Sequence, residues 1–278
     1  MSHPARRGSY REYAPCRELI PFVDCFWSRI AHPGESAPLQ HRVLPDGCVD
    51  ILFDVAACRQ AGGRGFVVGT MTRPVVFETL GDVHLVAVRF RPGGAYPFFG
   101  LPLRELTDAR VDLHELWPAC GPLENRLVES EVVLRQVRLV EQSLRERLAH
   151  IRVVDGRLLG AIDTVVARPE AMSVWALGER LGMSRQHLTR RFKDYVGIGP
   201  KQLARVMRMQ SVVRRIRAAR ALEWSAVAVD AGYYDQAHMI SEFRALTGLT
   251  PGRFAASPRR QVPFFQDIRR PGPHDSRD

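Results

Sequence analysis

The sequence predicts an α+β protein of two domains, with an N-terminal antiparallel β-barrel or sandwich that carries added helices and an all-α C-terminal domain. Three observations support this division. Short segments rich in Val and Phe, separated by Gly, Pro and Asp, fill residues 20–92 and are typical of antiparallel sheets. Helical periodicity replaces them further along the chain. Within the helical part, two similar stretches, FKDYVGIGP and FRALTGLTP, lie fifty-one residues apart.

The charge distribution separates the same two parts. Residues 1–150 contain 18 Arg and 18 acidic residues, whereas residues 151–278 contain 22 basic and 12 acidic residues. The whole net charge of +10 therefore lies in the second part. Such an excess favours an anionic partner, with nucleic acid before a membrane surface. Arginine-rich codon usage alone would not leave the first part neutral.

Membrane insertion and secretion are not indicated. No apolar run approaches the roughly 18–20 residues that cross a bilayer, and the N-terminal stretch MSHPARRGSYREYAP lacks the apolar core of a signal peptide. We therefore expect a cytoplasmic protein with no membrane partner. The five cysteines form no C-x-x-C pair, and we expect them to be reduced packing residues; they are Cys16, Cys25, Cys48, Cys58 and Cys120.

The N-terminal strands are predicted at residues 25–31, 48–55, 65–71, 74–80 and 83–90. Asp50 and Asp54 share a strand face that we expect to be solvated. Residues 93–102 indicate a turn and a helix, and residues 106–118 have short helical character.

Residues 122–149 have the apolar periodicity of an amphipathic helical region. Its predicted apolar face contains Leu123, Leu127, Leu134, Val137, Leu144 and Leu148. This face either docks on the barrel or pairs with its copy in a second subunit, and both alternatives stay open here. A further helix is predicted from Asp155 to Ala167. We divide the chain into domains at residues 1–150 and 151–256, followed by a flexible Pro/Arg-rich tail at 257–278.

The two similar stretches belong to a duplication. Three pairs match at a spacing of fifty and four at fifty-one; the pairs are Leu177/Val227, Gly178/Ala228, Gly182/Gly232, Leu188/Met239, Phe192/Phe243, Gly197/Gly248 and Pro200/Pro251. Each copy predicts a helix, a glycine turn and a second helix. The glycine can end the first helix in the left-handed conformation, and Ser184 or Asp235 can cap the second helix. Gly178 and Ala228 are both small, so we expect the two crossed helices of each copy to touch at these positions.

The second helix of each copy has a buried and an exposed face. If Leu188 and Phe192 face inward, Gln186, Arg190 and Lys193 face outward at about 100° per residue. The equivalent outward positions of the second copy are Ala237, Ser241 and Arg244, flanked by Gln236 and His238. Such side chains suit base edges and phosphates in a major groove. Residues 200–217 predict one linking helix between the copies.

The segments LGERLGMSRQHLTRRFKDYVGIGPKQL and VAVDAGYYDQAHMISEFRALTGLTPGRF resemble the two half-motifs of the AraC/XylS family of bacterial transcription regulators, over Met172 to Ala256. The resemblance implies base contacts at Gln186, Thr189 and Arg190, and at Gln236, Ala237, His238 and Ser241. Tyr233, Ala237 and Met239 depart from the family's more usual Phe, Ser and Phe. Our complete predicted DNA-binding set is Arg185, Gln186, Thr189, Arg190, Lys193, Gln236, Ala237, His238, Ser241 and Arg244.

The first 150 residues are also similar to a sensor-type domain of some family members, in LPDGCVDILFD, VVGTMTRP, VRFRPGGA and LTDARVDLHELW. Sensor domains of this family often resemble cupin barrels, and a cupin metal site uses clustered histidines. His32, His41, His84 and His114 are scattered with no H-x-H pair, although His41 and His84 lie on predicted strand regions and could meet in a barrel. We therefore predict no metal and no cofactor. Two interpretations remain for Trp27, Phe53, Phe90 and Arg89: they line an effector pocket, or they simply pack in the core.

We therefore predict a sequence-specific regulator, not an enzyme, that binds double-stranded promoter DNA and responds to a small effector through its N-terminal domain. RNA polymerase is an expected partner, and a homodimer is an open alternative. Two rival hypotheses stay in view. One is a β-barrel metalloenzyme or thiol sensor, with Cys48 as the oxidisable thiol, that carries an accessory DNA-binding module. The other is an architectural protein that bends DNA without ligand control.

Overall fold

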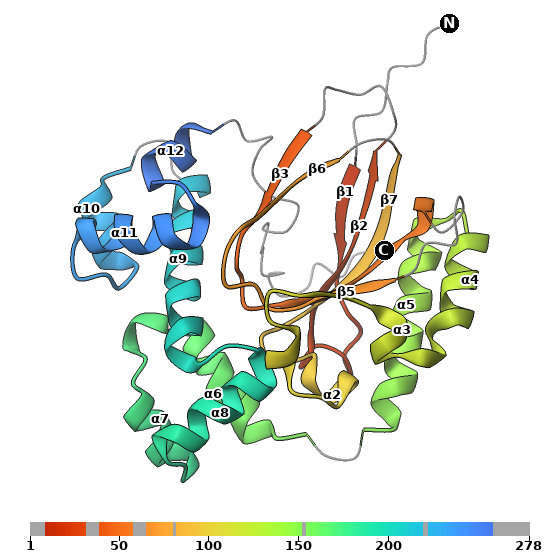
Figure 1. Ribbon diagram of the computed structural model, residues 1–278, viewed down its shortest axis with the longest axis horizontal. Coiled ribbons are helices and arrows are strands. Elements are labelled where there is room, and N and C mark those ends of the chain that lie inside the picture. Colours follow the sequence, from red (N-terminus) through yellow and green to blue (C-terminus); the bar gives the residue numbers. More distant parts are fainter. Residues whose placement is uncertain are drawn as a thin grey trace, which may run out of the picture.

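The computed structural model of the protein contains an antiparallel N-terminal β-region and a helical C-terminal region (Figure 1). This confirms the predicted fold class at that level. The structure describes residues 9–31, 39–57, 65–79, 82–151, 154–218 and 222–257. Cys58 and the predicted tail beyond Ser257 lie outside the described residues.

Six strands form the main sheet, in the order β1-β2-β7-β4-β5-β8, with every neighbouring pair antiparallel. Their bounds are β1 Ser9–Tyr13, β2 Val23–Ala31, β4 Val49–Asp54, β5 Phe66–Val68, β7 Val83–Phe90 and β8 Arg110–Asp112. The central strand β7 is buried on both faces, because Val86, Val88 and Phe90 belong to one apolar cluster and Ala87 belongs to another. The main sheet therefore lies inside the domain rather than on its surface.

Two further strands, β3 (Leu39–Val43) and β6 (Val75–Thr79), form a separate two-stranded sheet. The sequence analysis missed β1 and β8, and it expected β3 only as the strand region that contains His41. Residues 106–118, expected to have short helical character, instead contain β8 before α3 (Leu113–Leu116). Pairing of β8 with β5 overrides the local helical tendency. The more specific cupin-like resemblance is not confirmed.

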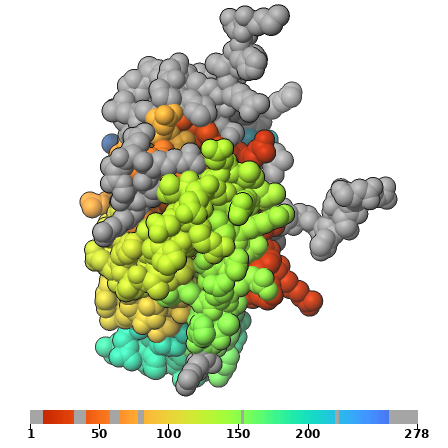
Figure 2. All heavy atoms as spheres, turned by 90° about the vertical axis from the view of Figure 1, so that its right-hand side faces the viewer, coloured from red at the N-terminus to blue at the C-terminus, as the bar shows by residue number. Residues whose placement is uncertain are grey.

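The remaining N-terminal helices cover one side of the main sheet. They are α2 (Tyr96–Phe99), η1 (Leu103–Leu106), η2 (Pro118–Cys120), α4 (Gly121–Glu129) and α5 (Val133–Ala149). Figure 2 views the molecule from the side on which α4 and α5 lie. The predicted helical region is thus two helices, and Leu134, which was expected on the apolar face, is 45% exposed. Leu123, Leu127, Val137 and Leu144 are buried in the sheet's core cluster, so docking on the sheet is observed.

The C-terminal helices share their own core. They are α6 (Gly156–Ala167), η3 (Pro169–Ala171), α7 (Val174–Leu181), α8 (Arg185–Val196), α9 (Pro200–Ala218), α10 (Trp224–Asp230), α11 (Gln236–Thr247) and α12 (Pro251–Ala256). As predicted, α6 starts directly after Asp155, whose carboxylate accepts a hydrogen bond from the Leu158 amide. The core of these helices also includes Leu44, which follows β3 in the N-terminal part. One apolar cluster therefore crosses the expected domain boundary.

Candidate DNA-binding surface

The first duplicated unit is formed by α7 and α8. Gly182 ends α7 in the left-handed conformation with a φ of 67°, as a turn glycine should. The Ser184 hydroxyl then accepts a hydrogen bond from the His187 amide and caps α8. Leu188 and Phe192 are fully buried on the inner face of α8. Local sequence signals therefore determine both where α8 begins and which face it exposes.

The second unit, formed by α10 and α11, repeats this construction. Gly232 adopts a φ of 78°, Asp235 caps α11 through the His238 amide, and Met239 and Phe243 are fully buried. At Gly178 the nearest contact comes from the turn between the two helices, because a Cβ atom there would lie 2.7 Å from the Met183 carbonyl oxygen.

Most of the predicted DNA-binding residues lie on the surface. In α8 the exposed members are Arg185, Gln186, Arg190 and Lys193, and in α11 they are Gln236, Ala237, His238, Ser241 and Arg244. Thr189 is half-buried, and its hydroxyl donates a 2.8 Å hydrogen bond to the Arg185 carbonyl oxygen. His187 of α8 is also exposed, although the predicted set did not include it.

An ionic network joins α11 to the linking helix α9. Glu242 accepts hydrogen bonds from Arg205 (2.8 Å) and Arg208 (3.2 Å). Burial opposes the ionisation of Glu242, but these two guanidinium groups hold its pKa below the ordinary value. The His238 Nε2 atom lies 3.6 Å from the same carboxylate. The network therefore connects an exposed residue of α11 to α9.

The linking helix α9 confirms the prediction for residues 200–217 and separates the two units (Figure 1). Its 19 residues span about 28 Å at a rise of about 1.5 Å each. Leu203, Val206 and Val213 are buried as predicted, while Met209 and Val212 are buried as well. α9 is thus enclosed on more than one side, which makes it a fixed spacer between the two units.

The C-terminal end of α8 contacts the N-terminal part of the chain. Thr70 donates a hydrogen bond to the Val196 carbonyl, and Thr107 donates one of 2.9 Å to the Gly197 carbonyl. The Tyr195 ring stacks on Tyr96 of α2 with 3.9 Å between the ring centroids. Arg104 and Asp194 also form an ion pair. The C-terminal end of α8 is therefore anchored to the sheet domain.

The second unit and α9 have equivalent anchors. Arg42 of β3 donates a 3.0 Å hydrogen bond to the Thr247 carbonyl at the end of α11. Gln210 of α9 donates a 2.6 Å bond to the Pro45 carbonyl. A Cβ atom on Gly47, whose φ is 77°, would lie 2.8 Å from the Leu203 side chain. The N-terminal part thus contacts both units and the spacer between them.

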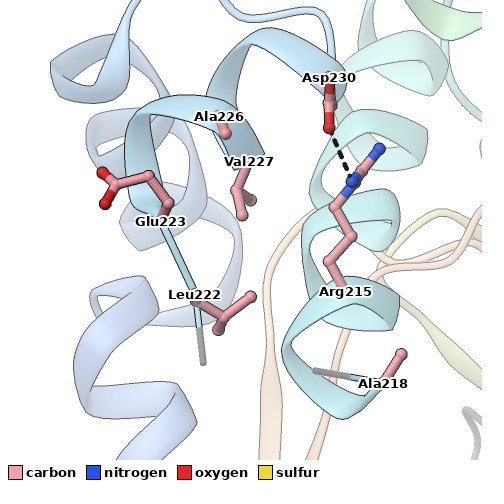
Figure 3. A pocket seen from close by; sticks show the side chains of 7 residues that line it. All are labelled: Arg215, Ala218, Leu222, Glu223, Ala226, Val227 and Asp230. Carbon is pink, nitrogen blue, oxygen red and sulfur yellow. Dashed lines mark hydrogen bonds and ion pairs between the residues drawn. The ribbon is translucent and has the colours of Figure 1, made fainter. Parts of the chain in front are cut away.

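A surface hollow lies between the end of α9 and α10 (Figure 3). Its lining residues are Arg215, Ala218, Leu222, Glu223, Ala226, Val227 and Asp230. Arg215 and Asp230 form a 2.9 Å ion pair across it. The hollow belongs to the second helix-turn-helix unit. It does not lie in the sheet domain, where an effector pocket was one of the two interpretations.

The motif LPDGCVD forms a buried ionic network, which corrects the expected solvated face of Asp50. Asp50 lies 3.3 Å from the buried Arg89 guanidinium and accepts a 3.1 Å hydrogen bond from the Trp27 indole. Burial raises the pKa of Asp50 to about 6, against the opposing charge of Arg89. Trp27 lies in a different apolar cluster from Phe53 and Phe90, so these aromatic residues do not line a common pocket.

The two histidines that were considered as metal ligands, His41 and His84, contact different residues. His41 lies 3.4 Å from Arg29, whereas His84 contacts Gln136 of α5 at 2.9 Å. Neither joins a group of three metal-ligand side chains among the described residues. Burial also raises the pKa of the Cys48 thiol well above its ordinary value, which disfavours the thiolate that a thiol sensor requires.

Two family models match the chain. Residues 11–112 match a domain of unknown function (DUF6597), and residues 177–257 match a helix-turn-helix domain. The second match covers both duplicated units except for the first residues of α7.

Two curated relatives are transcription regulators by description. An AraC-like transcription regulator of Streptomyces lividans is 28% identical over 146 residues, which cover 49% of this chain and 47% of that protein. An uncharacterised HTH-type transcriptional regulator of Haemophilus influenzae is 25% identical over 119 residues, covering 42% and 40%. The chain therefore spans less than half the length of the curated relatives it matches.

Two solved structures are also similar. The DNA-binding domain of AdpA, in complex with a target DNA, is 23% identical with a TM-score of 0.34, covering 36% of this chain and 90% of that chain. ToxT from Vibrio cholerae is 10% identical with a TM-score of 0.41, covering 90% and 97%.

Proposed function

The chain belongs to the AraC/XylS family through its helix-turn-helix part, and from this premise we propose that it is a sequence-specific transcription regulator that binds double-stranded promoter DNA. One observation supports this most strongly. Two equivalent helices, α8 and α11, each bury an apolar face and expose polar and cationic side chains, and one enclosed helix separates them. Two such helices can enter successive turns of a major groove.

The exposed residues take different roles in this proposal. Gln186 and Arg190 of α8, with Gln236, Ala237, His238 and Ser241 of α11, read base edges. Arg185, Lys193 and Arg244 contact phosphates, which position the protein without reading sequence. Thr189 contributes its methyl group, since its hydroxyl bonds within the helix. The α9 span of about 28 Å is shorter than the roughly 34 Å between groove entries on one face of DNA, so either the bound duplex bends or one helix sits shallow in its groove.

The N-terminal domain, residues 1–150, would regulate this DNA-binding domain, residues 151–256. A small effector bound in the sheet domain could act through the anchors at the ends of α8 and α11, because those contacts lie on both recognition helices. RNA polymerase and a second copy of the chain are further proposed partners. Such a regulator works on DNA in the bacterial cytoplasm, and no enzymatic step is part of the proposal. Among the described residues, no helix has the length and apolar character needed to cross a bilayer.

A fluorescence titration tests the proposal. The full chain is titrated into labelled fragments of the promoters adjoining its own gene, and into scrambled fragments of equal length and composition, at physiological salt. We expect at least one promoter fragment to bind about 10³-fold more tightly than its scrambled copy. Equal affinity for every fragment would contradict specific regulation. Equal affinity together with bending of each fragment would support the architectural alternative.

A further inference from the structure

Three side chains with metal-binding atoms meet beside the edge of the main sheet. His114, Cys120 and Glu124 place their imidazole nitrogen, thiol sulfur and carboxylate oxygen within 4.8 Å of one another. They form the only such group of three among the residues that the structure describes. Cys120 is fully buried, and the side chains of Glu124 and His114 are 11% and 29% exposed. The group is therefore largely enclosed, with its histidine nearest to solvent.

Short helices bring these residues together. Cys120 is the N-cap residue of α4, and Glu124 lies four residues further on, so both side chains lie on one face of that helix. His114 comes from the preceding turn, α3, whose start is capped by Asp112. All three residues thus lie within eleven residues of sequence, in the pattern H-x5-C-x3-E.

The surroundings hold the carboxylate and the histidine in place. The Gly65 amide donates a 2.7 Å hydrogen bond to Glu124 Oε1, which leaves Oε2 for His114 Nε2, also at 2.7 Å. The Gly65 carbonyl accepts a 2.9 Å bond from the Leu113 amide. Such bonds behind the ligand atoms orient metal-binding side chains in proteins. Gly65 directly precedes β5, so the group also ties α3 and α4 to the sheet.

The charges and donor atoms match one class of cation. A thiolate and a carboxylate together carry two negative charges, which a divalent cation neutralises in an enclosed site. Sulfur, imidazole nitrogen and carboxylate oxygen are the three donor types that bind Zn²⁺. Mg²⁺ and Ca²⁺ prefer oxygen ligands only.

We propose that His114, Cys120 and Glu124 bind a zinc-class divalent cation in the N-terminal domain. Three protein ligands leave the fourth tetrahedral position to water, on the side where His114 reaches the surface. On binding, His114 would hold the metal as a neutral imidazole through the ring nitrogen that carries no proton, Glu124 would hold it as a carboxylate, and the Cys120 thiol would lose its one proton to solvent. The competing interpretation is a proton-bridged His114–Glu124 pair with Cys120 as a neutral neighbour.

Metal content and cobalt spectra of the full, untagged chain test this site. After expression in zinc-supplemented medium and dialysis, we expect about one zinc per chain by elemental analysis. Reconstitution with Co²⁺ should produce an intense near-ultraviolet band from sulfur-to-cobalt charge transfer. Zinc-free protein without that band would overturn the proposal, and this measurement requires no variant to fold.

Variants assign the ligands. We expect C120S to lose the cobalt band, and H114Q and E124Q to weaken zinc binding at least about 10-fold. C16S and C58S are the matched cysteine controls, and H84Q is the histidine control; each should keep one zinc and the band. Circular dichroism verifies that each variant is folded. Retention of the full cobalt band by folded C120S would overturn the proposal, as would its loss in C16S or C58S.

Discussion

Single residues on α8 differ in what they are expected to read. Arg190 lies one turn after Gln186 on the exposed face, in the middle of α8, whereas Lys193 lies one turn further along. A bidentate guanidinium can distinguish a guanine, whereas a lysine at the groove edge acts as a point charge on phosphate. Substitution of Arg190 and substitution of Lys193 should therefore have different effects on DNA binding.

Arg190→Ala should cost about 1–3 kcal/mol of specific binding and relax the preference at one base pair. Lys193→Ala should weaken binding to all sequences by a similar factor and reduce the salt dependence by about one released counterion. Titrations of a promoter fragment and its single-base variants, at several salt concentrations, measure both effects. A uniform loss for Arg190→Ala would reassign Arg190 to phosphate.

A second prediction concerns His41 and pH. Burial and the neighbouring Arg29 lower the pKa of His41 from 6.5 to about 4. Because the folded-state pKa is depressed, the unfolded state binds more protons between these values. The contribution of His41 to stability is therefore present above pH 6.5 and is lost as the pH falls from 6.5 towards 4. In His41→Gln, urea unfolding should show a shallower loss of stability over this interval. His187→Gln, at an exposed position, is the control; equal slopes in both variants would contradict the prediction.

At the level of elements, the two recognition helices depend on their caps and on their buried residues. The caps Ser184 and Asp235 satisfy backbone amides at the start of α8 and α11. The residues that carry the proposed DNA contacts do not take part in the buried core. Stability and DNA recognition are therefore assigned to different side chains of the same helices.

Ser184→Ala should lower the free energy of unfolding by about 0.5–2 kcal/mol, because one amide at the start of α8 loses its partner. Ser241→Ala, on the exposed face of α11, should change stability by less than about 0.5 kcal/mol but weaken promoter binding. Denaturant unfolding and DNA titration of the two serine variants make the comparison. A large stability loss in Ser241→Ala would show that the proposed separation of roles is wrong.

For the whole molecule, contacts between the sheet domain and the helical units decide how rigidly the recognition helices are held. Thr107 and Thr70 bond the end of α8, Arg42 bonds the end of α11, and Gln210 bonds α9 to the loop after β3. Leu44 inserts into the helical core. Effector control through the N-terminal domain requires such contacts, because a ligand can shift an equilibrium only through differential interactions.

Loosening these anchors should reduce specific binding. In Thr107→Val the 2.9 Å bond to the Gly197 carbonyl is lost, and in Gln210→Leu the 2.6 Å bond to the Pro45 carbonyl is lost. We expect each variant to bind a promoter fragment several-fold more weakly, with little change for scrambled DNA, since neither residue is proposed to contact DNA. Thr164→Val, which removes one bond within α6 and one between α6 and α7 but none to the sheet domain, is the control. Tighter binding by both anchor variants would indicate that the anchors inhibit DNA binding instead.

Much of the helical part could be predicted from the sequence, because its signals are local. Glycine turns, capping residues and apolar positions three and four residues apart are properties of short segments, and duplication presents them twice. The starts of α8 and α11, and both bounds of α6 and α9 to within one residue, accordingly agree with the prediction. The exposure of nine of the ten predicted DNA-binding residues follows from the same periodicity.

Tertiary structure decided what depends on segments distant in sequence. The missed strands β1 and β8 are short, and they exist because β2 and β5 pair with them. Asp50 is buried because Arg89, from another strand, compensates its charge. His114 was set aside as a scattered histidine because no local pattern shows that α3 folds back onto α4 and Gly65. The helix-turn-helix units are thus determined by neighbouring residues, whereas the buried charges and the interdomain anchors arise only when distant segments meet.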